Sequence, residues 1–103
     1  MDIATIEKNV ELAATLLKAL SNDRRLLIVC VLYSGEKCVG ELEKIVGLSQ
    51  SALSQHLARL RRDEIVHTRR DAQTIYYSIK DPAAVRVLAC LHDIYCPDSP
   101  NHI

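Results

Sequence analysis

The segment LSQSALSQHL, residues 48–57, constrains this chain more than any other, because it reads as a short helix with two unlike sides. At about 100° per residue, Leu53, Leu57 and Leu60 fall on one stripe and are expected to pack inward. The opposite side carries small hydroxyls and amides, which let a helix lie close to the edges of DNA bases. The pattern therefore predicts a recognition helix for the major groove of duplex DNA.

A second amphipathic segment lies directly upstream, where apolar residues recur at helical spacing from Val39 to Val46. Gly47 follows at a position where the end of a helix favours a residue that tolerates positive φ. Ser49 is well placed to cap the next helix by accepting a hydrogen bond from a free backbone N–H. These signals predict a helix-turn-helix over residues 39–61.

Two runs rich in β-branched and aromatic residues follow, IVHTRR at residues 65–70 and TIYYSI at residues 74–79. The polar stretch of residues 71–73 separates them. We expect a hairpin over residues 65–79 that forms a wing beside the helix-turn-helix. A small α+β core with solvated polar faces would show the same order of elements and is the plainer alternative to DNA binding.

The candidate contacts with DNA follow from their places in these elements. Glutamine can pair with adenine, and serine can donate or accept, so the polar side of the recognition helix is expected to read bases. Other polar and basic residues on the helix are expected to steady the DNA backbone, and those of the wing to reach the flanking minor groove or phosphates. The expected base readers are Gln50, Ser51, Ser54 and Gln55, the other helix residues are His56, Arg59 and Arg62, and the wing residues are Arg69, Arg70 and Gln73.

The distribution of charge supports this assignment, although the formal net charge is zero. Residues 49–80 carry six Lys and Arg against three Asp and Glu. Residues 1–48 carry six against seven, and residues 81–103 carry one against three. The positive charge is therefore concentrated on the proposed helix and wing, where it would attract phosphates.

The helices expected at the two ends are more apolar than a small domain needs. One covers residues 1–20, and the other covers residues 82–96 after the helix-start signal Asp81-Pro82. We expect a homodimer through these two helices, which would place two recognition helices about 34 Å apart and favour a pseudo-palindromic operator. The alternative is that both helices complete the core of a monomer.

Length and composition fit one mainly helical α+β domain over residues 1–103, with an aliphatic core because Trp and Phe are absent. No segment resembles a signal peptide or a membrane span, so we expect a cytoplasmic protein with reduced cysteines. We expect neither an enzyme nor a cofactor, since the chain offers no nucleophile motif, phosphate-binding glycine loop or paired carboxylates.

Four cysteines, Cys30, Cys38, Cys90 and Cys96, stand at spacings that match no common zinc site, and no two of them form C-x-x-C. From spacing alone, each is expected to behave as a small, inert hydrophobe. The residues by themselves therefore predict no metal site.

Nearly the whole chain resembles the ArsR/SmtB family of winged-helix repressors. The resemblance rests on the segments ALSNDRRLLIVCVL, VGELEKIVGLSQSALSQHLARLRRDEIVHTRRDAQTIYYSI and LHDIYC. It implies a winged helix-turn-helix dimer built from four helices, two strands and a last helix. In such a dimer the fourth helix recognises DNA, and the first and last helices form the interface.

The cysteine of LLIVCVL and the cysteine that ends LHDIYC are similar to the pair found in one branch of this family, which senses reactive sulfur species or oxidants. The resemblance implies that Cys30 and Cys96 form a redox-sensing dithiol. It also implies that a disulfide or polysulfide bridge between them changes the affinity of the dimer for DNA. Cys38 or Cys90 would exchange with such a bridge if it lay near.

Two alternatives stay open beside dithiol sensing. Metal-sensing relatives carry a Cys-x-Cys box, of which this chain keeps only the first ligand, Cys38, so a metal-responsive repressor would need ligands from elsewhere. A protein-interaction module would instead dock the basic helix on an acidic partner, without sequence-specific DNA binding.

Overall fold

The computed structural model describes residues 2–96 of the chain. Its elements are, in order, α1 (Ile3–Leu20), α2 (Asp23–Tyr33), β1 (Lys37–Cys38), α3 (Val39–Val46), α4 (Gln50–Arg62), β2 (Val66–Asp71), β3 (Thr74–Ile79) and α5 (Pro82–Tyr95). This order confirms the expected winged helix-turn-helix and adds one short strand, β1. Met1 and residues 97–103, which the expected domain includes, lie outside the described residues.

The buried side of α4 is the one that the leucine spacing predicted. Leu53, Leu57 and Leu60 are 0%, 1% and 0% exposed, and they join one aliphatic cluster with Ile28 of α2 and Leu42 of α3. Burial of a leucine side chain contributes about 1.5–3 kcal/mol. The three leucines therefore fix the rotation of α4 about its own axis.

Polar side chains cap the N-termini of α4 and α5. The Ser49 hydroxyl accepts a hydrogen bond from the backbone N–H of Ala52 at 3.2 Å, which confirms the expected cap of α4. Asp81 accepts from the N–H of Ala83 at 2.9 Å and begins α5 directly before Pro82. The starts of α4 and α5 are therefore encoded locally, by the capping residues Ser49 and Asp81.

The three strands form one antiparallel sheet in the order β1-β3-β2. β1 pairs with the central strand through Lys37 opposite Tyr77 and Cys38 opposite Tyr76. Our sequence analysis missed β1, because two residues are too few to show the alternation that marks a strand.

The wing is the hairpin of β2 and β3, and its turn is tighter than expected. Asp71 pairs with Thr74 as the last residue of β2, so the turn consists of Ala72 and Gln73 rather than residues 71–73. Ala72 adopts φ 57°, which a two-residue hairpin turn needs and which alanine rarely adopts. The structure therefore confirms the hairpin, moves Asp71 from the turn into β2 and shortens the turn by one residue.

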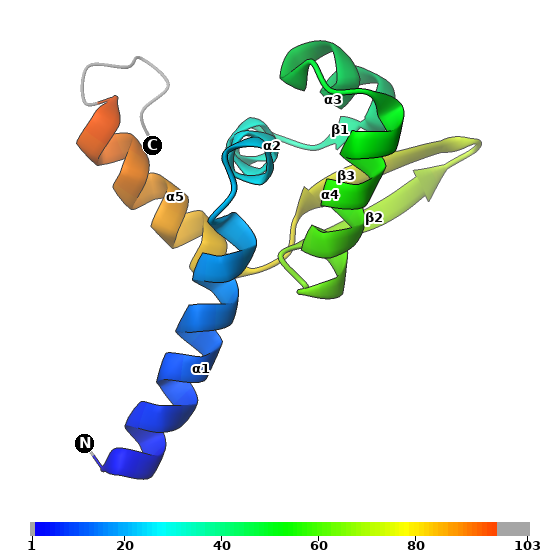
Figure 1. The fold of residues 1–103 in the computed structure, drawn as a ribbon. Helices are drawn as coiled ribbons and strands as arrows, with labels where there is room; N and C mark the ends of the chain where they lie inside the picture. The colour runs from blue at the N-terminus through cyan, green and yellow to red at the C-terminus, as the bar shows by residue number, and fades with distance from the viewer. Residues whose placement is uncertain (1, 97–103) are drawn as a thin grey trace.

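Figure 1 shows α1 running away from the other elements and α5 leaving the sheet on the side away from α4. Both helices keep large apolar side chains exposed in the single chain. They are Ile3, Ile6, Val10, Leu12 and Leu17 of α1, and Val85, Ile94 and Tyr95 of α5. These helices thus have an apolar surface that the other described residues do not cover.

Two glycines at opposite ends of α3 give a test of the turn into α4. Gly47 has φ +74° and open space around an added Cβ, so Gly47→Ala should destabilise the fold by about 1 kcal/mol through its backbone alone. Gly40 lies inside α3, also with open space, and Gly40→Ala should stabilise the fold by up to about 1 kcal/mol. Urea unfolding at one fixed protein concentration measures both. A Gly47→Ala variant as stable as wild type would contradict the assigned turn.

Candidate nucleic-acid interface

The outer side of α4 is polar and open to solvent. The four expected base readers are all exposed: Gln50, Ser51, Ser54 and Gln55. His56 is half-buried at the edge of this side. Because the opposite side is fully buried, the helix can present these side chains in one orientation only.

Two arginines of α2 tie this helix to α3 on one side and to α1 on the other. Arg24 donates from Nη1 to the backbone carbonyl of Val46 at the end of α3, at 3.5 Å. Arg25 donates from Nε to the carbonyl of Ala19 near the end of α1, at 2.7 Å. Each cation satisfies a carbonyl that the end of a helix leaves open. Our sequence analysis gave these residues no role, because their partners are set by tertiary packing.

The last turn of α4 carries Arg59, Arg61 and Arg62. Arg59 pairs with Asp63 at 2.8 Å between Nε and Oδ2, whereas the Nε of Arg62 lies 3.7 Å from Oδ1 of the same carboxylate. The side chain of Arg62 is 69% exposed, and exposed ion pairs contribute little free energy. Arg62 is therefore the freer of the two expected phosphate contacts.

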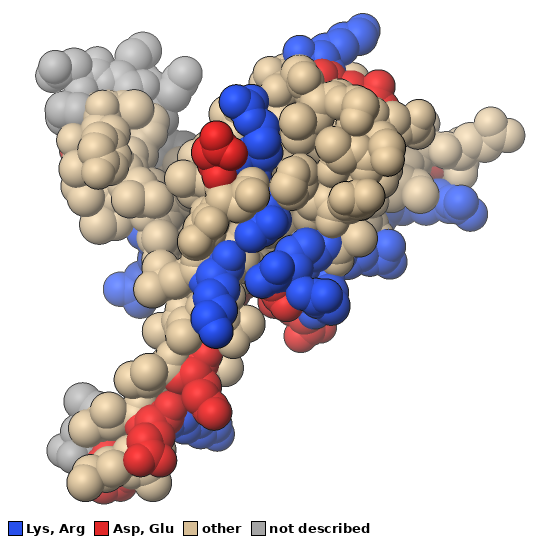
Figure 2. All heavy atoms as spheres, viewed as in Figure 1, with Lys and Arg blue, Asp and Glu red and all other residues tan. Residues whose placement is uncertain are grey.

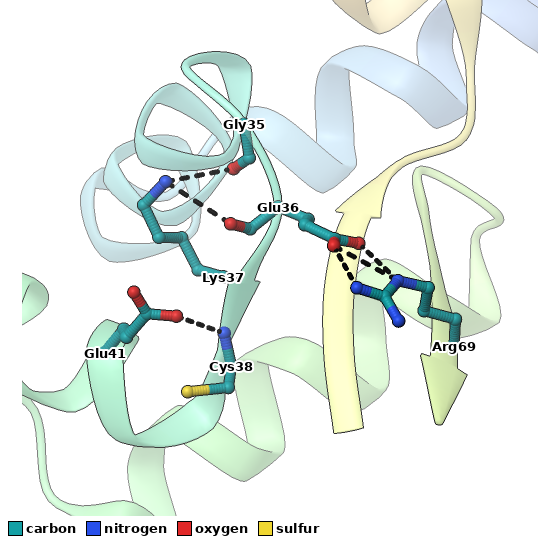
Figure 3. A network of polar contacts seen from close by, with 6 residues as sticks. All are labelled: Gly35, Glu36, Lys37, Cys38, Glu41 and Arg69. Carbon is teal, nitrogen blue, oxygen red and sulfur yellow. Dashed lines mark hydrogen bonds and ion pairs between the residues drawn. The ribbon is translucent and has the colours of Figure 1, made fainter. Parts of the chain in front are cut away.

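On the wing, Arg69, Arg70 and Gln73 are all exposed, as their proposed role requires. Arg69, however, already has a partner: its guanidinium donates to both carboxylate oxygens of Glu36, with Nε–Oε distances of 2.9 and 3.1 Å (Figure 3). Its Cζ also lies 4.5 Å from the ring centre of Tyr76. The hydrogen bonds from Arg69 hold the pKa of the Glu36 carboxyl below its ordinary value.

Figure 2 shows where charge gathers on the face seen in Figure 1. Lys and Arg side chains form a band from the region of α3 and α4 to the upper end of α1, while Asp and Glu side chains follow the lower part of α1. The acidic residues of the α1 helix are Glu7 and Glu11. The charge asymmetry read from the sequence is thus an asymmetry in space.

The two expected sensing thiols lie in different helices, Cys30 in α2 and Cys96 directly after α5. Both are free and exposed. Neighbouring protein atoms keep part of the water away from the Cys30 thiol and so raise its pKa, and the negative charge of a Cys96 thiolate raises it further. The charge of a Cys96 thiolate therefore reaches the Cys30 thiol, although 66 positions separate the two residues in the chain.

The other two cysteines, Cys38 and Cys90, lie in different elements of the fold. Cys38 is the residue before α3, and its backbone N–H donates to the Glu41 carboxylate at 3.0 Å (Figure 3). Cys90 is exposed on α5. Within residues 2–96, no group of three or more His, Cys, Asp and Glu side chains is placed to hold a metal ion.

The helices of the described part of the chain are all too short or too polar to cross a membrane.

The family described as bacterial regulatory protein, arsR family, matches residues 22–68, which run from the cap of α2 into β2. The transcriptional activator HlyU of Vibrio cholerae is 49% identical over 93% of this chain and 89% of its own length. The biofilm growth-associated repressor of Xylella fastidiosa is 43% identical over 88% of this chain and 80% of its own length. The similarity thus extends well beyond the helix-turn-helix.

Solved structures agree with these relatives. Reduced HlyU from Vibrio cholerae superposes with a TM-score of 0.87 over 91% of this chain and 99% of its own. A homodimeric winged helix-turn-helix DNA-binding domain from Mycobacterium bovis, 26% identical, superposes with a TM-score of 0.78 over 91% and 86%. This chain therefore belongs to the arsR family and is a DNA-binding transcriptional regulator with a winged helix-turn-helix fold.

Proposed function

We propose that this chain is a homodimeric repressor that inserts α4 of each protomer into the major groove of a pseudo-palindromic operator. The observation that carries the proposal is the exposed Ser and Gln side of α4, held outward by the buried Leu53, Leu57 and Leu60. Short polar side chains allow the close approach that base reading needs.

In this proposal the candidate residues of α4 and the wing have separate tasks. Gln50, Ser51, Ser54 and Gln55 read base edges, while His56, Arg59 and Arg62 hold the backbone of the DNA. Arg70 and Gln73 reach the flanking minor groove or phosphates from the tip of the wing. An open groove between α4 and the sheet, lined in part by Ser54, Arg61, Arg62 and Tyr77, gives the DNA backbone room between helix and wing.

The apolar residues that α1 and α5 leave exposed support the dimer. Ile3, Val10 and Leu17 of α1 are each more than half exposed and recur every seven residues on one side of the helix, and an exposed apolar surface of this kind marks an interface between proteins. The Mycobacterium bovis domain of the same fold is homodimeric. A second copy of this chain would cover both helices and set two α4 helices about 34 Å apart.

We further propose that Cys30 and Cys96 form the switch. With peroxide, the two thiols lose two protons and two electrons and join as a disulfide, while the peroxide is reduced to two waters. With two low-molecular-weight persulfides, each thiol takes one sulfur and releases a thiol. The two protein persulfides then join as a trisulfide and release hydrogen sulfide.

The helices that carry the two thiols connect the proposed DNA-binding surface with the proposed dimer interface. Cys30 lies in α2, which packs against α3, α4 and α5, and Cys96 follows α5, the proposed interface helix. A covalent bridge between α2 and the end of α5 would favour one arrangement of the helix-turn-helix relative to the dimer. Only such a difference in free energy between arrangements can change the affinity for DNA.

The proposal places the protein in the cytoplasm, where a bacterial regulator meets its DNA. The probe for the following tests is the operator duplex, which we define as a duplex that the reduced wild-type protein selects from a pool of random sequences.

We predict that Gln55→Ala weakens binding to the operator duplex by about 1–3 kcal/mol, because the amide would lose its contacts to a base. Binding to random duplex DNA of the same length should stay nearly unchanged. Fluorescence anisotropy at one salt concentration measures both affinities. Equal losses on the two DNAs would remove Gln55 from base reading.

We predict that Arg62→Gln reduces the salt dependence of DNA binding, whereas Arg86→Gln does not. Both variants lose one positive charge, but Arg62 ends α4 while Arg86 lies on α5. The slope of log K against log salt should fall by about 0.9 for each phosphate contact that is lost. Equal slopes for the two variants would contradict a DNA surface centred on α4.

We predict that treatment with peroxide or a persulfide lowers the affinity of wild type for the operator duplex by about 5- to 150-fold. Cys30→Ser and Cys96→Ser should both resist this loss, and the matched control Cys90→Ser should not. Mass spectrometry on the same samples should find a bridge between Cys30 and Cys96 in wild type. Unchanged affinity after full bridging would defeat the switch and leave the DNA-binding proposal intact.

A further inference from the structure

The ion pair between Glu36 and Arg69 joins the wing to the segment between α2 and β1. Glu36 stands directly before β1, and Arg69 lies in β2, 33 positions later. The two residues meet through the Nε and Nη2 atoms of Arg69 and both carboxylate oxygens of Glu36. Figure 3 shows the carboxylate and the guanidinium facing each other across the central strand.

The sheet register explains how such distant residues meet. Tyr76 of the central strand pairs with Cys38 of β1 on one side and with Arg69 of β2 on the other. Directly paired residues point to the same face of a sheet, and so do residues two apart on one strand. Glu36, two residues before Cys38, therefore reaches over the same face as Arg69. The guanidinium lies above the Tyr76 ring, 4.5 Å from its centre.

The base of the wing is anchored in the core by Val66, Tyr77 and Ile79, but the pairing of the wing with the rest of the sheet is short. β1 has only two residues, and a two-stranded hairpin is at best marginally stable by itself. Figure 1 shows the tip of the β2–β3 hairpin extending well beyond the helices. Any tilt at the base of the hairpin is amplified at the tip, where Arg70 and Gln73 lie.

We infer that Glu36 is a positioning residue of the DNA-binding surface, which acts by clamping Arg69 and so holds the wing at a fixed angle to α4. The inference rests on the proposed DNA binding. It gives Arg69 a different task from that of Arg70, because two of its three nitrogens already donate to Glu36. A bidentate ion pair needs the planar guanidinium of arginine, which lysine does not offer.

The first test needs no DNA and compares hydrogen exchange of the β2 and β3 amides by NMR. Glu36→Gln and Arg69→Lys should each speed this exchange about two- to fivefold, the range expected for loss of an exposed pair. The double variant should be no faster than either single variant. The control is Glu64→Gln, which removes the same charge and breaks another exposed pair, with Lys80 at 3.0 Å. Equal exchange in all of these proteins and wild type would overturn the inference.

The second test measures affinity for the operator duplex. Glu36→Gln removes a negative charge near DNA, so it would raise the affinity if Glu36 merely competed with phosphate for Arg69. A clamp predicts the opposite, about a two- to fivefold loss relative to Glu64→Gln. Arg69→Lys keeps the charge and should lose the same factor. A rise for Glu36→Gln, or wild-type affinity for Arg69→Lys, would overturn the inference.

The two tests separate failure of the clamp from failure of the proposed function. If wild type selects no duplex, DNA binding through α4 fails, and hydrogen exchange still decides whether Glu36 holds the wing. If wild type binds while the variants exchange and bind like Glu64→Gln, only the clamp fails.

Discussion

The burial of three leucines on one side of α4 is the interaction on which the rest of the structure depends. Leu53, Leu57 and Leu60 are nearly inaccessible to solvent and share one core with α2 and α3. A rotation of α4 that exposed them would cost several kcal/mol, so the Ser and Gln side is held outward whether or not DNA is present. The surface that we propose reads DNA is therefore preorganised by the core rather than created by binding.

The domain leaves two surfaces for other molecules, and they differ in chemistry. The surface of α4 and the wing is polar and basic, whereas α1 and α5 expose aliphatic side chains. α2 packs against α3, α4 and α5, and it carries Cys30. In our proposal a second copy covers one surface and DNA covers the other, while the thiols of Cys30 and Cys96 connect the two.

Local signals predicted much of the fold, because each lies within a few residues of its effect. The stripe of α4, the caps Ser49 and Asp81 and the positive φ of Gly47 were all visible in the sequence. Contacts between distant segments were not. β1 is too short for a pattern, the wing turn places an alanine where glycine or asparagine would be expected, and the Glu36–Arg69 pair depends on a sheet register that no local spacing reveals. The link between Cys30 and Cys96 came from family resemblance for the same reason.

The most direct test of the account is the footprint and stoichiometry of the reduced protein on its selected operator duplex. Hydroxyl-radical footprinting combined with the mass of the complex would give both. The account predicts two chains for each duplex and two protected segments related by a two-fold axis, with centres about 34 Å apart along the DNA. One chain on one protected segment, or no preference for any sequence, would contradict it.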